Sequence, residues 1–243
     1  MQYPFKHALM LAITTLTCIG ISFSPMSSAA TTSGQPTTVA AVAPQARSLP
    51  LEAMTPITKN LYDQYRWSLM YYYGVTVDNS LLQTMTLMHL KRWPEHIQTV
   101  ELAHTLDQDN FLRRWLRPLV NIIQLAGNIT VRNGRDEPTI YEFDPYLIFR
   151  WTQFPWNDYI TTSLALGEGI SYASSIPAIE SKDRDNAKRL LNYMIAEATF
   201  SLPSYPRWQL VARVHHRSGV FGLYHAGNTG SNDIALGVRY LFD

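Results

Sequence analysis

Hydrophobic and polar residues alternate with a period of two along most of the chain after residue 65. The clearest example runs from Trp208 to Val220. One of its faces is apolar and then turns polar; its members are Trp208, Leu210, Ala212, Val214, His216, Ser218 and Val220. The other face is mostly polar and consists of Gln209, Val211, Arg213, His215 and Arg217. Successive side chains of a β-strand point to opposite faces, so the pattern predicts a strand with lipid on one side and a wet interior on the other.

Eight segments of this kind follow one another, each near the ~10 residues that a tilted strand needs to cross a membrane. They are expected near residues 67–76, 96–106, 119–132, 140–152, 159–171, 190–202, 208–222 and 232–242. In the sixth, Leu190 and Leu191 compete for the same face, which leaves its orientation open. The pattern predicts an all-β fold, an eight-stranded antiparallel transmembrane β-barrel of the outer-membrane type, over residues 65–243.

The connections between these segments differ at the two ends of the predicted barrel. With the N-terminus in the periplasm, the connections at residues 78–95, 133–139 and 175–189 face outside, and they are long or charged. The opposite turns, at residues 153–158 and 203–207, are short and contain proline. This asymmetry is typical of outer-membrane barrels. The connection at residues 107–118, which is long and holds three arginines, is the exception. A soluble lipocalin-like barrel or a β-sandwich is the alternative that the alternation alone leaves open.

The N-terminus predicts export. Lys6 precedes an apolar run over residues 8–23, and Ser28 and Ala30 are small residues where a signal peptidase reads, so cleavage is expected after Ala30. The single cysteine, Cys18, lies inside this run, so the mature chain has no cysteine for disulfides or metal binding. Residues 31–64 are expected to form a disordered leader and a short periplasmic segment, with a helical turn near the barrel mouth.

Composition narrows the class further. After the signal no apolar stretch reaches the ~18 residues of a spanning helix, which leaves a soluble periplasmic protein or an outer-membrane barrel. The 14 tyrosines, 9 phenylalanines and 6 tryptophans favour the barrel, whose interfaces carry aromatic girdles. The formal net charge of +1 gives no indication of nucleic-acid binding. The alternating last strand ends in an aromatic, Phe242, and resembles the signal recognised by the barrel-assembly machinery, a partner during insertion; Asp243 after it is a small departure.

The seventh segment carries the candidate chemistry. His216, Arg217 and Ser218, with the glycine-containing loop and the closing strand after them, resemble the lipid A 3-O-deacylases, the PagL-type outer-membrane enzymes. The resemblance spans residues 67–242, but specific motif residues occur only in the last two strands. It implies an eight-stranded barrel with a His-x-Ser pair on the lipid face, Ser218 as nucleophile and His216 as general base, and no metal or other cofactor.

The spacing is compatible with this chemistry, because residues i and i+2 point the same way, ~6.5–7 Å apart along a strand. Two positions depart from the family pattern. Gly219 replaces an asparagine that would supply an oxyanion donor, leaving only the Gly219 backbone N–H for that role. Asn232 replaces an acidic residue that would orient the histidine; its amide oxygen could hold the imidazole tautomer but cannot balance an imidazolium charge.

Two functions follow. The first is an outer-membrane esterase that removes an ester-linked acyl chain from lipid A, with lipopolysaccharide of the outer leaflet as its partner. The second is a non-catalytic small barrel in envelope integrity or surface interaction, in which the polar end of the seventh strand only meets headgroups and water. Elsewhere, Glu101 and His104 are expected on opposite faces of one strand. Glu168 is expected on the lipid face, ~10 Å from the pair, with no assigned role.

Overall fold

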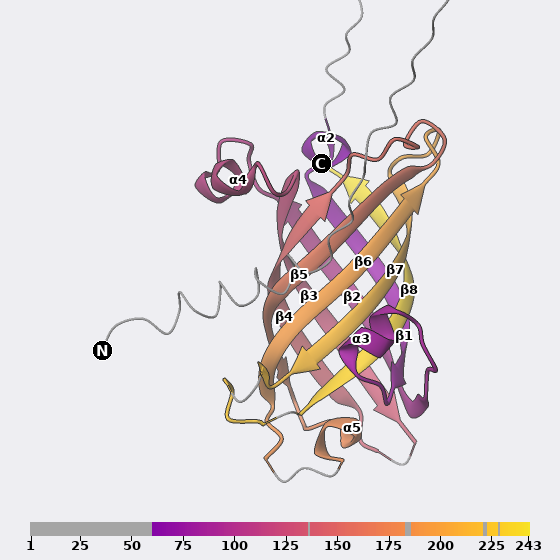
Figure 1. The fold of residues 1–243 in the computed structure, drawn as a ribbon, viewed down its shortest axis with the longest axis vertical. Helices are drawn as coiled ribbons and strands as arrows, with labels where there is room; N and C mark the ends of the chain where they lie inside the picture. The colour runs from indigo at the N-terminus through magenta and orange to yellow at the C-terminus, as the bar shows by residue number, and fades with distance from the viewer. Residues whose placement is uncertain (1–59, 136, 183–185, 221–222, 228) are drawn as a thin grey trace, which may run out of the picture. The chain divides into compact units, whose positions relative to one another are not determined.

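The computed structural model describes residues 60–135, 137–182, 186–220, 223–227 and 229–243. Within them, eight antiparallel strands form a closed barrel in which each strand pairs with the next and the last pairs with the first (Figure 1). The strands are β1 (Trp67–Val77), β2 (Arg92–Thr105), β3 (Ile122–Gly134), β4 (Ile140–Trp151), β5 (Thr161–Ala173), β6 (Leu190–Ser201), β7 (Trp208–Ser218) and β8 (Gly230–Phe242). The predicted fold class is confirmed. The predicted signal peptide and most of the predicted leader lie outside the described residues.

The strand bounds differ from those predicted mainly at the outer end, where β1 meets β2 and β7 meets β8. Strand β2 begins at Arg92 rather than near residue 96, because Arg92 pairs with Val77 beyond an irregularity in the ladder. Strand β7 ends at Ser218 rather than at residue 222. Val220 has a φ of 43°, a left-handed conformation that a β-branched residue rarely adopts and that no strand can continue through.

The two faces of the barrel wall match the sequence pattern. Side chains of one parity are buried in the lumen, and those of the other parity present an apolar surface to the outside; the outer set includes Leu69, Val100, Leu102, Leu125, Ile129, Phe143, Leu164, Leu210, Leu236 and Val238. In β6 the open question is settled, since Leu190 is exposed and Leu191 is buried. A polar interior inside an apolar wall is the outer-membrane architecture. None of the described helices is long and apolar enough to cross a membrane.

Two short helices lie at the inner end of the barrel. Helix α2 (Leu61–Gln64) buries Tyr62, whose hydroxyl donates to Gln209 Oε1 at 3.0 Å inside the lumen. Helix α4 (Phe111–Leu116) carries Arg113, whose two terminal nitrogens donate to the Asp63 carboxylate at 2.5 and 2.9 Å. This bidentate pair ties α4 to α2. The long connection at residues 107–118 therefore has a structural role at the inner end.

At the outer end, helix α3 (Leu81–Met85) and helix α5 (Ala178–Ser181) belong to long connections. Helix α3 lies against the outside of the wall, in contact with β7 and β8 (Figure 1). Its start is set by a capping box, in which Ser80 and Gln83 satisfy each other's backbone N–H groups. Helix α5 buries Ile179 and Glu180. The outer connections thus cover one stretch of the lipid-facing wall beside β7.

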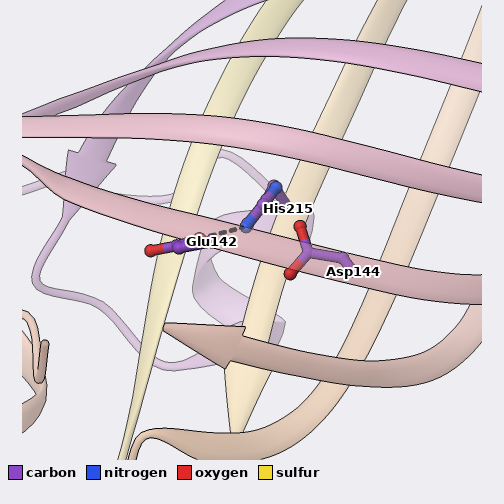
Figure 2. Close-up of side chains that lie close together, drawn as sticks. All are labelled: Glu142, Asp144 and His215. Atoms are coloured by element: carbon purple, nitrogen blue, oxygen red, sulfur yellow. Dashed lines mark ion pairs between the residues drawn. The ribbon is translucent and has the colours of Figure 1, made fainter. Parts of the chain in front are cut away.

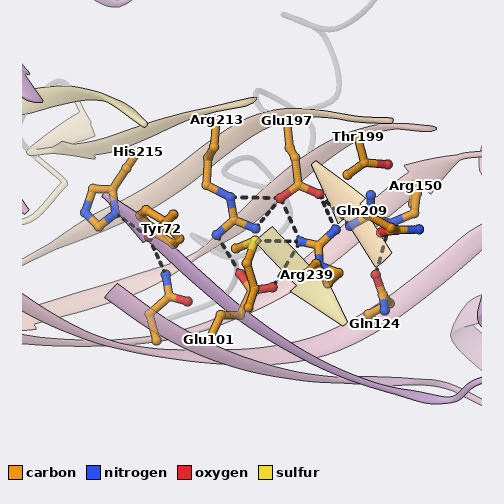
Figure 3. A network of polar contacts seen from close by, with 12 residues as sticks. Tyr72, Glu101, Gln124, Arg150, Glu197, Thr199, Gln209, Arg213, His215 and Arg239 are labelled. Atoms are coloured by element: carbon orange, nitrogen blue, oxygen red, sulfur yellow. Dashed lines mark hydrogen bonds and ion pairs between the residues drawn. The ribbon is translucent and has the colours of Figure 1, made fainter. Parts of the chain in front are cut away.

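Charged side chains fill the lumen in two groups. The inner cluster consists of Glu101, Arg150, Glu197, Arg213 and Arg239 (Figure 3). The outer cluster consists of Glu95, Arg132, Glu142, Asp144, Glu180, His215, Arg217 and Asp233. Hydroxyls of Tyr72 and Tyr193 lie between them, both within 3.1 Å of His215 Nδ1. An interior filled in this way is a packed core, as expected for a barrel of eight strands.

Candidate functional site on the outer wall

The predicted catalytic dyad, His216 and Ser218, lies on the lipid-facing side of β7. It is near the end of the strand that leads into the β7–β8 connection, at the outer end of the barrel. His216 and Ser218 are both partly exposed on the parity that also carries the exposed Trp208 and Leu210. Arg217, the residue between them, is buried in the lumen. The structure therefore places the two predicted groups on one side of the wall, at the depth where the apolar surface gives way to the outer connections.

Asn232 contacts His216 as the sequence analysis expects. The two residues are directly opposite in the β7–β8 ladder, and His216 Nδ1 lies 2.8 Å from Asn232 Oδ1. The Asn232 amide nitrogen is engaged elsewhere, donating to the Asn79 carbonyl oxygen at 2.8 Å. Because this leaves Asn232 its oxygen as an acceptor, the proton of a neutral His216 belongs on Nδ1 and the lone pair on Nε2. That tautomer is the one a general base needs.

The side chain of Ser218 is less constrained than that of His216. Among the described residues, its hydroxyl forms no hydrogen bond, to His216 or to any other group. Across the β6–β7 ladder its Cα pairs with that of Asn192, so the Asn192 side chain emerges on the same face of the wall. The Asn192 carboxamide in turn lies close enough to the Glu168 carboxyl group to interact with it. The site is thus a row of polar side chains across four strands, from Glu168 to Asn232.

Sequence reasoning did not find Asn192 and assigned no role to Glu168. Each is a polar residue on the mostly apolar, lipid-facing side of its strand. A polar residue in such a position is the sequence feature that could have identified both. Only the stagger of β5, β6 and β7 brings them beside Ser218. Glu168 also lies near Tyr224 of the β7–β8 connection, where burial raises the pKa of the phenol and the Glu168 charge raises it further.

Gly219, the predicted oxyanion donor, is already engaged. Its backbone N–H donates to the Thr229 carbonyl oxygen at 2.9 Å, which closes the ladder between the ends of β7 and β8. A Cβ at this position would lie 2.5 Å from the carbonyl oxygen of Gly227. Glycine at 219 is therefore required by the close approach of two backbone segments. In this conformation an oxyanion would have to displace Thr229 to reach that N–H.

A polar cleft adjoins the site on the β8 side. It has a volume of about 360 Å³ and is lined by β1–β2 loop residues, α5 residues and the outer end of β8; the lining includes Asn79, Ser80, Gln83, Lys182, Gly230 and Asn232. Gly230 is the Cα partner of Ser218. Beyond the cleft, the β1–β2 loop exposes a set of apolar side chains, Leu82, Met85, Leu87, Met88 and Leu90. Polar and apolar surfaces thus meet within reach of the dyad.

Glu101 and His104 point to opposite sides of the wall, as expected from their spacing. Glu101 is buried in the inner cluster. His104 packs on the outside against Trp67, with ring centroids 4.4 Å apart and the ring planes tilted by 53°. In the lumen, the described residues that could hold a metal ion are Glu142, Asp144 and His215 (Figure 2). The side chains of these three residues lie in the lumen, on the opposite side of the wall from those of His216 and Ser218.

No protein-family model and no curated protein matches the sequence. Among solved structures, the chain is similar to the outer membrane enzyme PagL, at 14% identity and a TM-score of 0.46 over 72% of this chain and 99% of that one. It is also similar to Neisserial surface protein A, at 12% identity and a TM-score of 0.41 over 72% and 96%. A third similar structure is OprG from Pseudomonas aeruginosa, at 10% identity and a TM-score of 0.31 over 73% and 97%. The similarity is one of fold, whose assignment rests on the register and burial described above.

Proposed function

We propose that this barrel is an outer-membrane esterase that removes an ester-linked acyl chain from lipid A. The observation that carries the proposal is the His216–Asn232 hydrogen bond on the outer wall, with Ser218 on the same face. Polar groups on a lipid-facing surface are costly and are usually there for function. A histidine held in the tautomer of a base, two residues from a serine, is the arrangement that acyl transfer requires.

In this mechanism Ser218 Oγ attacks the ester carbonyl while His216 Nε2 takes its proton. His216 then returns the proton to the leaving sugar oxygen, and water completes the hydrolysis by the same route. A side-chain rotation must first bring the two groups together, which binding of the lipid would have to favour. Asn232 keeps the imidazole oriented throughout, although an amide cannot balance the imidazolium charge as a carboxylate would.

Asn192 is the best-placed side-chain donor for the oxyanion, because its amide nitrogen has a second N–H besides the one that can interact with Glu168. It is opposite Ser218 in the ladder and on the same face, whereas the Gly219 N–H already donates to Thr229. The cleft beside Gly230 and Asn232 has the polar lining and size for part of a sugar headgroup. The acyl chain would follow the apolar wall beside Val214 and Leu210. We expect Asn192→Ala to lower turnover by ~10²–10³, the usual cost of losing one oxyanion donor.

Mass spectrometry of lipid A, extracted from cells that express the barrel, tests the proposal. We expect loss of one hydroxyacyl chain with the native protein and full-length lipid A with Ser218→Ala. Ser201→Ala is the matched control. Ser201 is a buried serine at the last position of β6, at the inner end of the barrel and away from Ser218, so its substitution should leave the activity intact. Unchanged lipid A with a barrel that is shown to be folded in the outer membrane would overturn the enzyme assignment.

The second candidate is a non-catalytic barrel in envelope integrity or surface interaction. The observation in its favour is that no hydrogen bond joins Ser218 to His216 within the described part of the chain. In that case the polar row from Glu168 to Asn232 only meets headgroups and water. Envelope permeability would then change when the whole barrel is deleted and would be insensitive to Ser218→Ala.

A further inference from the structure

Three side chains of the outer cluster converge in the lumen from β4 and β7. Glu142, Asp144 and His215 each offer one ligand-type atom, and these atoms all lie within 4.8 Å of one another (Figure 2). His215 Nε2 is 3.4 Å from Glu142 Oε2. All three side chains are fully buried, so no bulk solvent accounts for their charges.

Asp144 has no ion pair among the described residues, and neither of its buried carboxylate oxygens accepts a hydrogen bond of normal geometry. The Ser171 hydroxyl lies beside it, close enough to interact with it, and has no other partner among the described residues. Glu142 Oε2 and His215 Nε2 form no hydrogen bond either, and their 3.4 Å contact is an ion pair only when His215 is protonated. A buried ionised carboxylate without a partner is strongly unfavourable. A positive charge at this site, carried by a proton on His215 or by a bound cation, would relieve these unsatisfied groups.

The charges of the lumen indicate the same deficit. Within the described residues, seven buried carboxylates face five buried arginines in the two clusters. The carboxylates are Glu95, Glu101, Glu142, Asp144, Glu180, Glu197 and Asp233, and the arginines are Arg132, Arg150, Arg213, Arg217 and Arg239. Asp63 and Arg113 at the inner mouth neutralise each other. One divalent cation beside a neutral His215 would balance the interior.

The groups around the point have the features of an outer ligand shell. His215 Nδ1 is 3.0 Å from the Tyr72 hydroxyl and 3.1 Å from the Tyr193 hydroxyl, so its other nitrogen is directed at Glu142 and Asp144. Arg132 donates to Glu142 Oε1 at 2.7 Å, which fixes that carboxylate and leaves Oε2 free. Metal-binding histidines and carboxylates are oriented by hydrogen bonds of this kind.

We propose that Glu142, Asp144 and His215 bind one divalent cation inside the barrel, with zinc as the best match. One imidazole and two carboxylate oxygens are a donor set that zinc accepts, and the Ser171 hydroxyl or a water would complete four ligands. Asp144 can rotate toward the ion because no hydrogen bond holds it. The ion is structural: it joins β4 to β7 across the lumen and does not depend on the outer wall being an esterase.

Zinc titration of the folded barrel tests this directly. The full-length protein is purified in detergent, stripped with a chelator, and titrated with zinc by calorimetry, with metal content measured after dialysis. We expect one tightly bound zinc per barrel, a higher unfolding temperature with zinc, and loss of both in Asp144→Asn. His104→Gln is the matched control, because it removes an outward-facing histidine and should leave binding unchanged.

Cobalt substitution provides a second measurement that needs no variant. Cobalt bound in the wild-type barrel should give the visible spectrum of a site with nitrogen and oxygen ligands. If protons on His215 and Asp144 balance the excess negative charge of the lumen, the folded wild-type barrel will bind neither metal tightly, and the proposal is wrong. It is equally wrong if Asp144→Asn, shown to be folded, binds zinc as well as the wild type does.

Discussion

The inner and outer clusters of the lumen are built from the same residue types and differ in how their charges are matched. In the inner cluster two carboxylates face three arginines. A single carboxylate, that of Glu197, forms ion pairs with Arg150, Arg213 and Arg239. In the outer cluster five carboxylates face two arginines and one histidine, and Asp144 has neither an ion pair nor a hydrogen bond among the described residues. The inner cluster therefore carries excess positive charge and the outer cluster excess negative charge.

This difference separates a cluster whose charges compensate one another from one that has room for a further cation. Where carboxylates and arginines interlock, each charge is compensated by neighbours on other strands, and the cluster holds the barrel wall together. Where carboxylates exceed their partners, the protein bears a desolvation cost that only a proton or a cation relieves. The same chemical change, from acid to amide, should therefore have opposite effects in the two clusters.

The largest effect is expected from Glu197→Gln. This change leaves three buried arginines without their shared partner, and we expect it to destabilise the folded barrel by about 3–5 kcal/mol, the usual result of breaking a buried ion pair. Urea unfolding in lipid or detergent, followed by tryptophan fluorescence, measures the change. A loss below ~1 kcal/mol would show that the inner cluster does not hold the wall together.

Asp144→Asn should shift stability in the opposite direction when no metal is present. Removing a buried charge that has no partner relieves a penalty of about 1–3 kcal/mol, so the variant should be more stable than the wild type in chelator. In zinc the order should reverse, because only the wild type gains binding energy. The same unfolding experiment, run with chelator and with zinc, checks both halves. Equal stability of the wild type and Asp144→Asn in both conditions would contradict the prediction that the outer cluster, unlike the inner one, has an uncompensated negative charge.

The tyrosines between the clusters should have a smaller effect, confined to metal affinity. The double change Tyr72→Phe and Tyr193→Phe removes both hydroxyls from His215 Nδ1 while keeping the rings. Loss of such second-layer hydrogen bonds typically weakens metal binding by about 10–100-fold. Calorimetric titration measures it, and Tyr62→Phe at the inner mouth is the control expected to bind zinc normally. An unchanged affinity in the double variant would place the ion elsewhere.

The smallest effect is expected from the pH dependence of α5. Burial raises the pKa of Glu180, with Arg217 opposing that rise. A carboxyl group whose folded pKa is raised stabilises the folded state below its unfolded pKa, and this contribution is lost as the pH rises through the folded value. Hydrogen exchange of α5, corrected for the intrinsic rate, should therefore show more frequent opening at higher pH. The dependence should be flatter in Glu180→Gln, and an equal slope in both proteins would contradict the assignment.

Alternation along the chain was sufficient to predict the barrel and the side of the wall on which most residues lie. The reason is local: side chains of a strand change face at every residue, so His216 and Ser218 had to share a face that Arg217 does not. The same rule placed Glu101 and His104 on opposite faces of one strand. It could not orient β6, where two leucines are adjacent, and it placed the start of β2 too late because the pairing of Arg92 with Val77 depends on the neighbouring strand.

Neighbours across strands were decided only by the tertiary structure. Asn232 could be proposed beside His216 through the family resemblance, but Asn192 beside Ser218 depends on the β6–β7 stagger, and His215 beside Glu142 and Asp144 depends on closure of the whole barrel. The engagement of the Gly219 N–H by Thr229 likewise needs two segments to meet. A period of two determines the face on which a side chain lies; strand register and closure determine which partner it meets there.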